Sequence, residues 1–375
     1  MYRTTKLFFS SLLIIQFTIG HGLAFAKENE VEDQVKPHHT STGFQNHPFV
    51  ETAAPKGVPF YLRRFWASVF VPDIPEGHAL SGEESINLLN AYKSDKLTWL
   101  GHATFLIQLS DMNILTDPFL GEFASPLSWA GPRRFVESGI TVENLPPIDL
   151  IIVSHNHYDH LDDYTITNIK SKENVQVVVP LGIKPFFEER GYSRIAELDW
   201  GDSISVKGIK VTSQGAVHDS ARSTSDHNKT LWSSWVLESS QNKVLFVGDS
   251  GYSETIFKKI GQLFGNIDYA LLPIGAYEPR ELMWMSHVTP EEAVKIGLDT
   301  GSRALVASHW GTVSSLSDEP VWEPPKRFKK AGLKENFSKE NIWIMKVGET
   351  RSIRNKLGIP EVENLSDNNE TDRHR

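Results

Sequence analysis

The chain has 375 residues, of which 39% are hydrophobic and 23% are charged, and its formal net charge is −9. This composition is typical of a globular protein with one large domain or two of ordinary size. The chain contains no cysteine, which excludes disulfides, iron–sulfur clusters and thiolate zinc sites, so any metal ion must be held by His, Asp or Glu. The acidic balance and the lack of basic repeats argue against a nucleic-acid partner.

The N-terminal segment has the plan of a secretory signal peptide. Arg3 and Lys6 precede an apolar run of 14 residues, 7–20, and Ala24-Phe25-Ala26 supplies the small residues of a cleavage site. We therefore expect a signal peptide over residues 1–26 and an exported chain, periplasmic or secreted, either free or membrane-associated. An uncleaved anchor is the alternative, although the apolar run is shorter than the ~20 residues that cross a bilayer. Cleavage would shift the net charge from −9 to −11.

Composition divides the rest of the chain into three parts. Residues 27–55 are predicted to form a flexible leader, residues 56–357 a single folded domain, and residues 358–375 a disordered tail. The leader and the tail are polar and lack hydrophobic periodicity, whereas the middle part alternates short β-like runs with helical stretches. We find no internal repeat and no composition break that would split the folded part.

Apolar runs in the middle part predict strands, and helical periodicity predicts helices between them. The last helix has clear start signals, with Thr289 as N-cap and Pro290 at the first position. Strands followed by helices occur twice, which suggests two sheets face to face with helices outside. In chain order the predicted strands are 97–101, 104–109, 112–116, 150–154, 175–179, 209–213, 231–237, 243–247, 269–272, 304–308 and 342–346, and the predicted helices are 163–169, 183–190, 253–264 and 290–300.

A cluster of metal-competent side chains follows the predicted strand 150–154. The run is His155-Asn156-His157-Tyr158-Asp159-His160, which places four candidate ligands within six positions. Imidazole nitrogens and carboxylate oxygens suit a Zn-like cation, and the offsets let His155 and His157 serve one ion while Asp159 and His160 serve a second. The spacing predicts a two-metal hydrolytic centre. The alternative is a solvated loop that traps cations adventitiously, although such a loop needs no buried strand ahead of it.

Three further candidate ligands stand where later apolar runs end. His218 follows the run 211–217, Asp249 closes the run 244–248, and His309 closes the run 304–308. Strand ends hold side chains rigidly, so a site formed there loses little entropy. Each of these residues alone is more often structural than a ligand. Together with the first motif they complete a set of seven candidate ligands.

This set resembles the binuclear site of the metallo-β-lactamase fold. The chain is further similar to the N-acyl-phosphatidylethanolamine-hydrolysing phospholipase D family, over about residues 97–346. The run 98–104 is shared with lactonase-like branches of the fold, whereas the Ile-Gly-Ala-Tyr-Glu-Pro-Arg run at 274–280 is more specific. The matching runs are 98–104, 115–118, 125–126, 131–135, 145–149, 248–252, 273–280 and 309–312.

The resemblance implies an α/β fold, a four-layer αββα sandwich of the metallo-β-lactamase type, and two divalent metal ions. Zn²⁺ is the first expectation for these ions, with iron and manganese as alternatives. The implied ligand set has three parts: His155, His157 and His218 on one ion, Asp159, His160 and His309 on the other, and Asp249 bridging the two.

The resemblance also implies catalytic roles. His287 matches a histidine that in the family points at the substrate, and the alternative is a helix neighbour without a chemical role. Asp159, Asp249 and His287 are therefore the expected catalytic residues. One departure is Asp219, which follows His218 at a position where relatives often have an aromatic residue. This difference leaves the substrate more open than the metals.

The implied activity is that of a phospholipase D-type phosphodiesterase. We expect hydrolysis of N-acyl-phosphatidylethanolamine-like phospholipids to N-acylethanolamine and phosphatidic acid. A metal pair can bridge one water as hydroxide, lower its pKa and neutralise charge on the phosphoryl oxygens. One alternative is a lactone, ester or amide hydrolase with the same fold and metals. A second alternative is a non-catalytic exported protein that binds metal or lipid.

Two runs of bulky residues bear on the partners. Residues 60–66 mix aromatics with cations and are expected to pack mainly inward, with contact to a lipid surface as the alternative. Residues 282–285 precede His287 and are expected to form a wall of the site. Arg133 and Arg134 are expected to be solvated or paired with carboxylates. The expected partner is a phospholipid or another phosphodiester, without nucleic acid, and both peripheral membrane contact and a homodimer are left open.

Overall fold

The computed structural model describes residues 36–50 and 57–353. The fold described here is that of the compact unit that begins at Pro37. The predicted signal peptide and the predicted tail lie outside the described residues. In the ranges that are described, no helix has the length and apolar character needed to span a bilayer.

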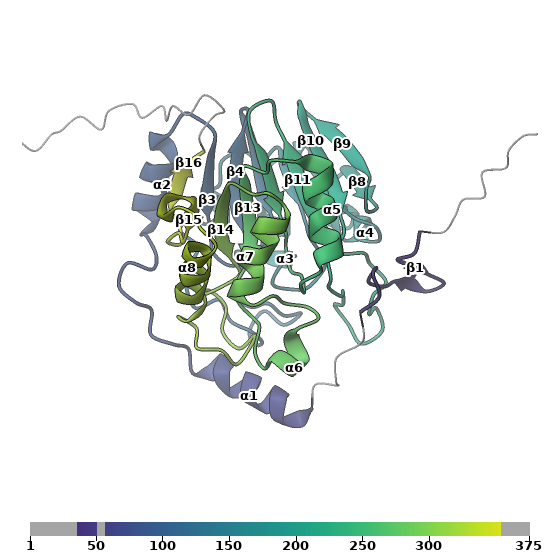
Figure 1. Ribbon diagram of the computed structural model, residues 1–375, viewed down its shortest axis with the longest axis vertical. Helices are drawn as coiled ribbons and strands as arrows, with labels where there is room; N and C mark the ends of the chain where they lie inside the picture. The colour runs from purple at the N-terminus through teal and green to yellow at the C-terminus, as the bar shows by residue number, and fades with distance from the viewer. Residues whose placement is uncertain (1–35, 51–56, 354–375) are drawn as a thin grey trace, which may run out of the picture. The chain divides into compact units, whose positions relative to one another are not determined.

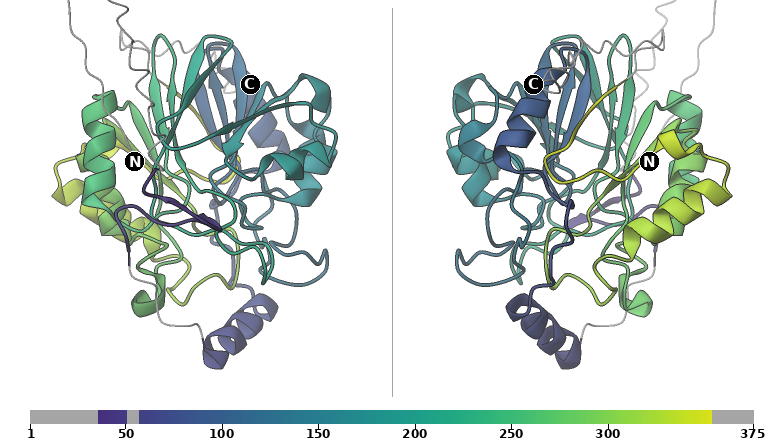
Figure 2. Two further views of the ribbon diagram at one scale, coloured as in Figure 1. Left: turned by 90° about the vertical axis from the view of Figure 1, so that its right-hand side faces the viewer. Right: turned by 90° about the vertical axis from the view of Figure 1, so that its left-hand side faces the viewer.

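Two seven-stranded mixed sheets lie face to face, and helices cover their outer faces (Figures 1 and 2). Trp99 and Ile152 of one sheet and Trp235 and Phe246 of the other belong to the same fully buried cluster between the sheets. A second buried cluster lies outside the first sheet and includes Phe187 of a covering helix. Because both faces of each sheet are covered, the central strands are apolar throughout. The predicted sandwich is confirmed.

The first sheet changes from antiparallel to parallel along its width. Its first four strands pair antiparallel, and the parallel part begins where Ile114 pairs with Leu150. In spatial order the strands are β16 (Thr350–Ser352), β3 (Lys96–Trp99), β4 (Phe105–Leu109), β5 (Met112–Thr116), β6 (Leu150–Ile152), β7 (Gln176–Pro180) and β8 (Arg194–Leu198).

The second sheet has the same mixed character. Its parallel part holds the strands whose ends carry Asp249 and His309. The predicted strand 231–237 begins only at Ser234, and the edge strands β8, β9 and β16 were not predicted because their residues are short, polar runs. In spatial order the strands are β15 (Ile342–Trp343), β14 (Ala304–Ser308), β13 (Tyr269–Pro273), β12 (Lys243–Phe246), β11 (Ser234–Glu238), β10 (Ile209–Gln214) and β9 (Ser203–Val206).

Most of the helices form the two outer layers, as the side views show (Figure 2), while α1 and α6 lie at one end of the domain (Figure 1). The predicted start of α7 is confirmed, because Thr289 Oγ1 accepts from Glu292 N while the Glu292 carboxylate accepts from Thr289 N. The helices are α1 (Val58–Val69), α2 (Gly82–Ala91), α3 (Asp163–Asn168), α4 (Lys184–Glu188), α5 (Glu254–Phe264), α6 (Arg280–Met283), α7 (Pro290–Asp299) and α8 (Pro324–Lys334), with 3-10 turns at Val142–Asn144, Lys172–Asn174 and Lys339–Asn341.

The predicted flexible leader over residues 27–55 is wrong for residues 36–50, and its other residues lie outside the described part of the chain. Residues 36–50 form a hairpin of β1 (His39–Thr40) and β2 (Gly43–Phe44). The hairpin is tied to the domain, since Phe44 N donates to Asn228 O at 2.8 Å. These polar residues have no core of their own, and contacts with residues far away in the sequence order them.

Candidate metal centre

Three imidazoles meet in one half of the site. His155 and His157 lie on the loop after β6, and His218 lies beyond the end of β10. His155 Nε2 is 2.8 Å from His157 Nδ1 and 3.1 Å from His218 Nε2, and His218 Nε2 is 3.3 Å from His157 Nδ1. Three ring nitrogens at these separations face one point, as the ligands of a single cation do.

The other half combines two histidines with two carboxylates. His160 Nε2 lies 3.6 Å from Asp159 Oδ2 and 3.0 Å from Asp249 Oδ2. His309 Nε2 lies 3.7 Å and 3.2 Å from the same two oxygens. The side chains of His160, His309 and Asp249 are buried. This half therefore offers a second set of converging nitrogen and oxygen atoms.

Asp249 connects the two halves. Its Oδ2 is 3.0 Å from His160 Nε2 and 4.0 Å from His218 Nε2. All seven side chains predicted from the sequence are thus in one cluster, and Asp249 lies between its two halves. Their binding of metal ions stays a prediction.

His287 lies at the edge of this cluster, in the turn between α6 and α7. Its Nδ1 is 3.7 Å from Asp249 Oδ2, and its ring packs edge-on against the His218 ring at 5.4 Å. The backbone around it is held because His287 O accepts from Arg280 Nη1 at 2.6 Å and Arg280 is paired with Glu292. The structure therefore places His287 beside the candidate ligands, while its role toward a substrate stays a prediction.

The cluster forms because several strands end at the same edge of the sandwich. The first motif follows β6, Asp249 follows β12 and His309 follows β14, all of which belong to parallel parts of the sheets. Gly248 allows the close approach of two of these ends. It has a φ of +66°, and a Cβ there would stand 2.3 Å from Ser154 Cβ. Only glycine fits this position without displacing the motif loop.

A shell of hydrogen bonds orients the candidate ligands. Asp117 is fully buried and follows β5. Its carboxylate accepts hydrogen bonds from His160 Nδ1, Ser154 N and Ser154 Oγ, each at 2.6 Å. His218 Nδ1 lies 2.9 Å from Ser286 O. Such partners fix the ring orientation and direct the opposite ring nitrogen toward the centre.

Burial and the mutual charges shift the pKa values strongly. Burial lowers the pKa of His218 to about 4 and that of His102 to about 3. Burial also acts against protonation of His309, but the Asp249 carboxylate prevails and raises the pKa of His309 to about 9. For Asp249, burial would raise the pKa, yet the adjacent histidines hold it well below its usual range. The protonated His309 ring and the ionised Asp249 carboxylate are therefore in direct contact inside the protein.

The donor set fits divalent metal ions. Among the described residues, buried His160 Nε2, His309 Nε2 and Asp249 Oδ1 have no hydrogen-bond partner. A buried polar atom without a partner costs about 1–3 kcal/mol, which binding to a cation would offset. Imidazole and carboxylate together suit zinc, iron or manganese.

Sequence reasoning missed two members of the site. His102 Nε2 lies 2.9 Å from Asp159 Oδ2, and its ring lies 3.9 Å from that of His309. Asp117 holds His160 as described above. Both residues lie just beyond strand ends, at β3 and β5, so the signal used for His218 and His309 was also present for them.

Two arginines have structural roles in the surrounding loops. Arg222 Nη1 donates to Asn156 O at 2.9 Å and to Leu161 O at 2.7 Å, so it braces the loop that carries the first motif. Arg134 is buried and donates to the backbone carbonyls of Leu100 and Val136, both at 3.2 Å. The expectation of a solvated or carboxylate-paired side chain is therefore wrong for Arg134. It is confirmed for Arg133, which pairs with Glu122 at 2.9 Å.

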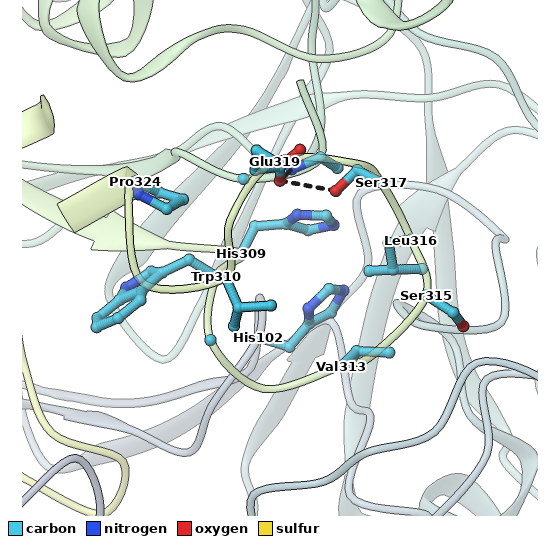
Figure 3. A pocket seen from close by; sticks show the side chains of 13 residues that line it. His102, His309, Trp310, Val313, Ser315, Leu316, Ser317, Glu319 and Pro324 are labelled. Atoms are coloured by element: carbon cyan, nitrogen blue, oxygen red, sulfur yellow. Dashed lines mark hydrogen bonds between the residues drawn. The ribbon is translucent and has the colours of Figure 1, made fainter. Parts of the chain in front are cut away.

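A pocket opens beside the second half of the site, with His102 and His309 pointing into it (Figure 3). The loop after β14 forms its wall and contributes Leu316 and Ser317. Glu319 fastens this loop, because its carboxylate accepts from Ser317 Oγ at 2.7 Å and from Ala276 N at 2.6 Å. Of the seven candidate ligands, His309 lines this pocket.

Known proteins share this fold and much of this sequence. A family model described as a beta-lactamase superfamily domain matches residues 112–310. The chain belongs to the metallo-β-lactamase superfamily. N-acyl-phosphatidylethanolamine-hydrolyzing phospholipase D 1 of Caenorhabditis elegans is 38% identical over 263 residues, which cover 67% of this chain and 74% of that protein. The mitochondrial protein of the same name from Saccharomyces cerevisiae is 33% identical over 259 residues, covering 68% of this chain and 55% of that protein. A metal-dependent hydrolase of Rubrobacter xylanophilus is 32% identical over 260 residues, 68% of this chain and 95% of that protein.

Solved structures agree on the fold. A possible metal-dependent hydrolase from Veillonella parvula has a TM-score of 0.55 at 18% identity, covering 69% of this chain and 99% of that one. An isothiocyanate hydrolase from Delia radicum gut bacteria has a TM-score of 0.54 at 19% identity, covering 68% and 98%. These likenesses show the fold alone. With the relatives above, the chain is a metal-dependent hydrolase, which confirms the predicted enzyme class.

Proposed function

We propose that this hydrolase is a phospholipase D-type phosphodiesterase acting on N-acyl-phosphatidylethanolamine-like phospholipids. The observation that carries the proposal is the convergence of six histidine and aspartate side chains, in two halves, around Asp249. The substrate class rests on the relatives named for hydrolysis of that phospholipid, at 38% and 33% identity. We further propose two Zn²⁺ ions as the metals.

Each ion would be held by its own group of residues in the cluster. His155, His157 and His218 would hold one ion, Asp159, His160 and His309 the other, and Asp249 both. When bound, such an ion pair activates a water and neutralises charge on the phosphoryl oxygens. Asp249 sets the spacing and does not act as a base. Because the chain has no cysteine, a thiolate nucleophile is excluded.

His287 would contact the phosphoryl group or the leaving oxygen. Its side chain is 13% exposed, and its Nδ1 is 3.7 Å from Asp249 Oδ2, so it lies between the ligands and the solvent. An imidazole in that position can donate a hydrogen bond to an oxygen that becomes negative during the reaction. Its turn is fixed by Arg280, which limits the entropy lost on binding.

The nearby arginines support a metal-based mode of phosphate recognition. Arg222 and Arg134 are committed to backbone carbonyls, and Arg280 is paired with Glu292 at 2.6 Å. If one of these arginines turned toward a substrate phosphate, the backbone carbonyls or the Glu292 carboxylate that it now contacts would lose their donor. Metal ions are the strongest local positive charges that the site can supply.

The helix α1 supports a proposal of peripheral membrane contact. Phe60 packs inward in a cluster with Ala276 and Met283, close to the pocket. Trp66 and Phe70 point to solvent with 56% and 71% exposure, so the expectation that the run 60–66 packs mainly inward holds for Phe60 and is wrong for Trp66. α1 and α6 lie at the same end of the domain (Figure 1). Exposed aromatic groups beside a pocket can enter a lipid interface and guide acyl chains.

A substrate panel tests the proposed reaction. Purified enzyme is incubated with N-acyl-phosphatidylethanolamine, phosphatidylcholine and an acyl-homoserine lactone, and the products are identified by mass spectrometry. Release of N-acylethanolamine with phosphatidic acid is the expected result. Opening of the lactone without phospholipid cleavage would replace the proposal by the lactone-hydrolase alternative, and cleavage at an ester bond would do the same for an esterase.

Two variants test the residue roles. Asp249→Ala should lose the metal of the candidate centre and turnover together, whereas His287→Ala should keep that metal and lose rate. His227→Ala is the matched control, because its imidazole is exposed and 3.8 Å from Asp219 rather than from a candidate ligand. Elemental analysis and steady-state kinetics decide the matter. Full activity in Asp249→Ala would refute the proposed centre.

Sedimentation with lipid vesicles tests the membrane contact. Trp66→Ser combined with Phe70→Ser should reduce the bound fraction on phosphatidylethanolamine vesicles several-fold. Leu333→Ser is the control, because Leu333 is a similarly exposed apolar residue on α8. Equal binding of the double variant and the control would remove α1 as the contact.

Export and metal identity need separate measurements. We propose that the segment 1–26 is cleaved during export, and N-terminal sequencing of the mature chain should begin at Lys27. Detection of Met1 in the mature protein would argue for a retained anchor. Elemental analysis of protein purified without added metal should find zinc in excess over iron and manganese.

A further inference from the structure

A second histidine–carboxylate cluster shares no residue with the candidate metal centre. His38 and His39 lie near the start of the described segment 36–50, and Asp199 follows β8. His38 Nε2 is 2.6 Å from Asp199 Oδ1, and His39 Nε2 is 2.8 Å from Asp199 Oδ2. Each carboxylate oxygen thus faces one imidazole nitrogen, and the two histidines come from a segment 160 residues away in the sequence.

The two imidazoles are arranged like the candidate ligands of the centre. The rings of His38 and His39 are 4.7 Å apart at 70°, and those of His155 and His157 are 4.6 Å apart at 85°. Their contacts of 2.6 and 2.8 Å with the carboxylate are similar to the 2.8 Å between the ring nitrogens of His155 and His157. One ligand atom of each of the three side chains lies within 4.8 Å of the other two. Ligand atoms of a tetrahedral zinc ion are about 3.3–3.6 Å apart, so His38 and His39 would each move away from Asp199 by less than about 1 Å to bind one.

The cluster is rigid and largely buried. The side chains of His38 and Asp199 are 5% and 9% exposed, while His39 is 30% exposed. His38 stacks on Trp200 at 4.1 Å, and Trp200 N donates to Asp199 Oδ1 at 2.7 Å. A cation held by all three side chains would contact the Asp199 carboxylate directly, and the partly exposed side at His39 would admit a water as a further ligand.

We propose that His38, His39 and Asp199 form a third divalent-cation site, suited to Zn²⁺. Two imidazoles and one carboxylate are a donor set that zinc accepts, with the fourth position taken by solvent. The site is structural, because it joins the segment 36–50 to the turn between β8 and β9.

The joined segment reaches the candidate metal centre. Asn46 Nδ2 donates to His218 O at 3.0 Å, and Asn46 Oδ1 accepts from His218 N at 3.0 Å. Asn46 Oδ1 also accepts from Trp232 Nε1 at 3.1 Å. A cation at His38 and His39 would therefore hold in place the segment 36–50, whose Asn46 positions His218. Asn46 is a positioning residue in this arrangement.

Metal stoichiometry tests the site directly. The full mature protein is saturated with Zn²⁺, dialysed against metal-free buffer and measured by elemental analysis. His39→Ala and Asp199→Asn should each hold one equivalent fewer than the wild type. His39→Gln should show the same loss with an intact fold, because glutamine can still donate to Asp199. His47→Ala, an exposed histidine of the same segment, should show none. Equal zinc content in the wild type, His39→Ala and Asp199→Asn would overturn the proposal and leave a hydrogen-bonded cluster only.

A background variant separates this site from the proposed catalytic ions. In Asp249→Ala, which should lose the ions of the centre, one zinc equivalent should remain and should disappear when His39→Ala is added. If the centre fails as proposed but the third site is real, the wild type and His39→Ala still differ by one equivalent.

Amide hydrogen exchange tests the fastening role. Removal of zinc from the Asp249→Ala protein should speed exchange of residues 38–46 several-fold, and His39→Ala should do so without chelation. Unchanged exchange in that segment after loss of the third equivalent would contradict the role in fastening.

Discussion

Asp117→Asn is the sharpest test of how the candidate centre is held. The side chain is fully buried and receives three hydrogen bonds, two from Ser154 and one from His160 Nδ1, each at 2.6 Å. Asparagine keeps the shape but removes the charge and presents an NH₂ group. If that group faces His160 Nδ1, the ring proton moves to Nε2, the atom that lies 3.0 Å from Asp249 Oδ2. The metal-binding atom would then be blocked by a proton.

The size of the effect follows from these contacts. A hydrogen bond to a charged group contributes about 1.5–3 kcal/mol, and loss of an outer partner of a ligating imidazole lowers metal affinity roughly 10–100-fold. The second figure corresponds to about 1.4–2.8 kcal/mol. Only the ion held by His160 should be affected. The three imidazoles of the other half do not contact Asp117 except through Ser154 Oγ, which is 2.9 Å from His155 Nδ1.

Competition with a chelator of known zinc affinity measures the change. Asp117→Asn should release one equivalent at a free zinc concentration 10–100-fold higher than the wild type requires, by the outer-partner effect, and should keep the other ion of the centre near its original affinity. Asp162→Asn is the matched control, because Asp162 is also buried and accepts backbone N–H groups, yet contacts no candidate ligand. Unchanged release from Asp117→Asn, or an equal shift in Asp162→Asn, would refute the reasoning.

Three further outcomes are expected. In the metal-free protein, burial opposes protonation of His309, but the Asp249 carboxylate raises the pKa of His309 to about 9. The protonated His309 ring therefore stabilises the fold fully below pH 6.5, and this stabilisation is lost as the pH rises toward 9. Protons also compete with metal, so the increase in Tm caused by Zn²⁺ should grow between pH 6.5 and 9, and a shrinking increase in a pH series would contradict this. Asn46→Ala, which removes both hydrogen bonds to the His218 backbone, should lower the affinity for the ion held by His218 about 10-fold in the same chelator assay. Unchanged affinity would show that Asn46 does not position His218. Arg134→Met should lower the free energy of unfolding in urea by about 2–4 kcal/mol, because buried carbonyls lose a charged donor; a loss below about 1 kcal/mol would show that water replaces it.

Local patterns in the sequence determined much of the architecture. Apolar runs located the central strands of both sheets, because strands buried on both faces are continuously apolar. The capping residues Thr289 and Pro290 located the start of α7. The spacing of His155, His157, Asp159 and His160 indicated a two-ion site, since those ligands are neighbours along the chain and need no distant partner to be recognised.

Only the tertiary structure decided which distant residues join the site and which support it. His102 and Asp117 enter through the pairing of strands, and their neighbours in space lie far from them in the sequence. Arg134 turns inward because it donates hydrogen bonds to buried backbone carbonyls, whereas its neighbour Arg133 pairs with Glu122 at the surface. The hairpin at residues 36–50 has no apolar pattern, since its order comes from contacts with Asp199, His218 and Asn228. Local composition reports what a segment can bury, and only the folded chain brings the partners that decide what it does bury.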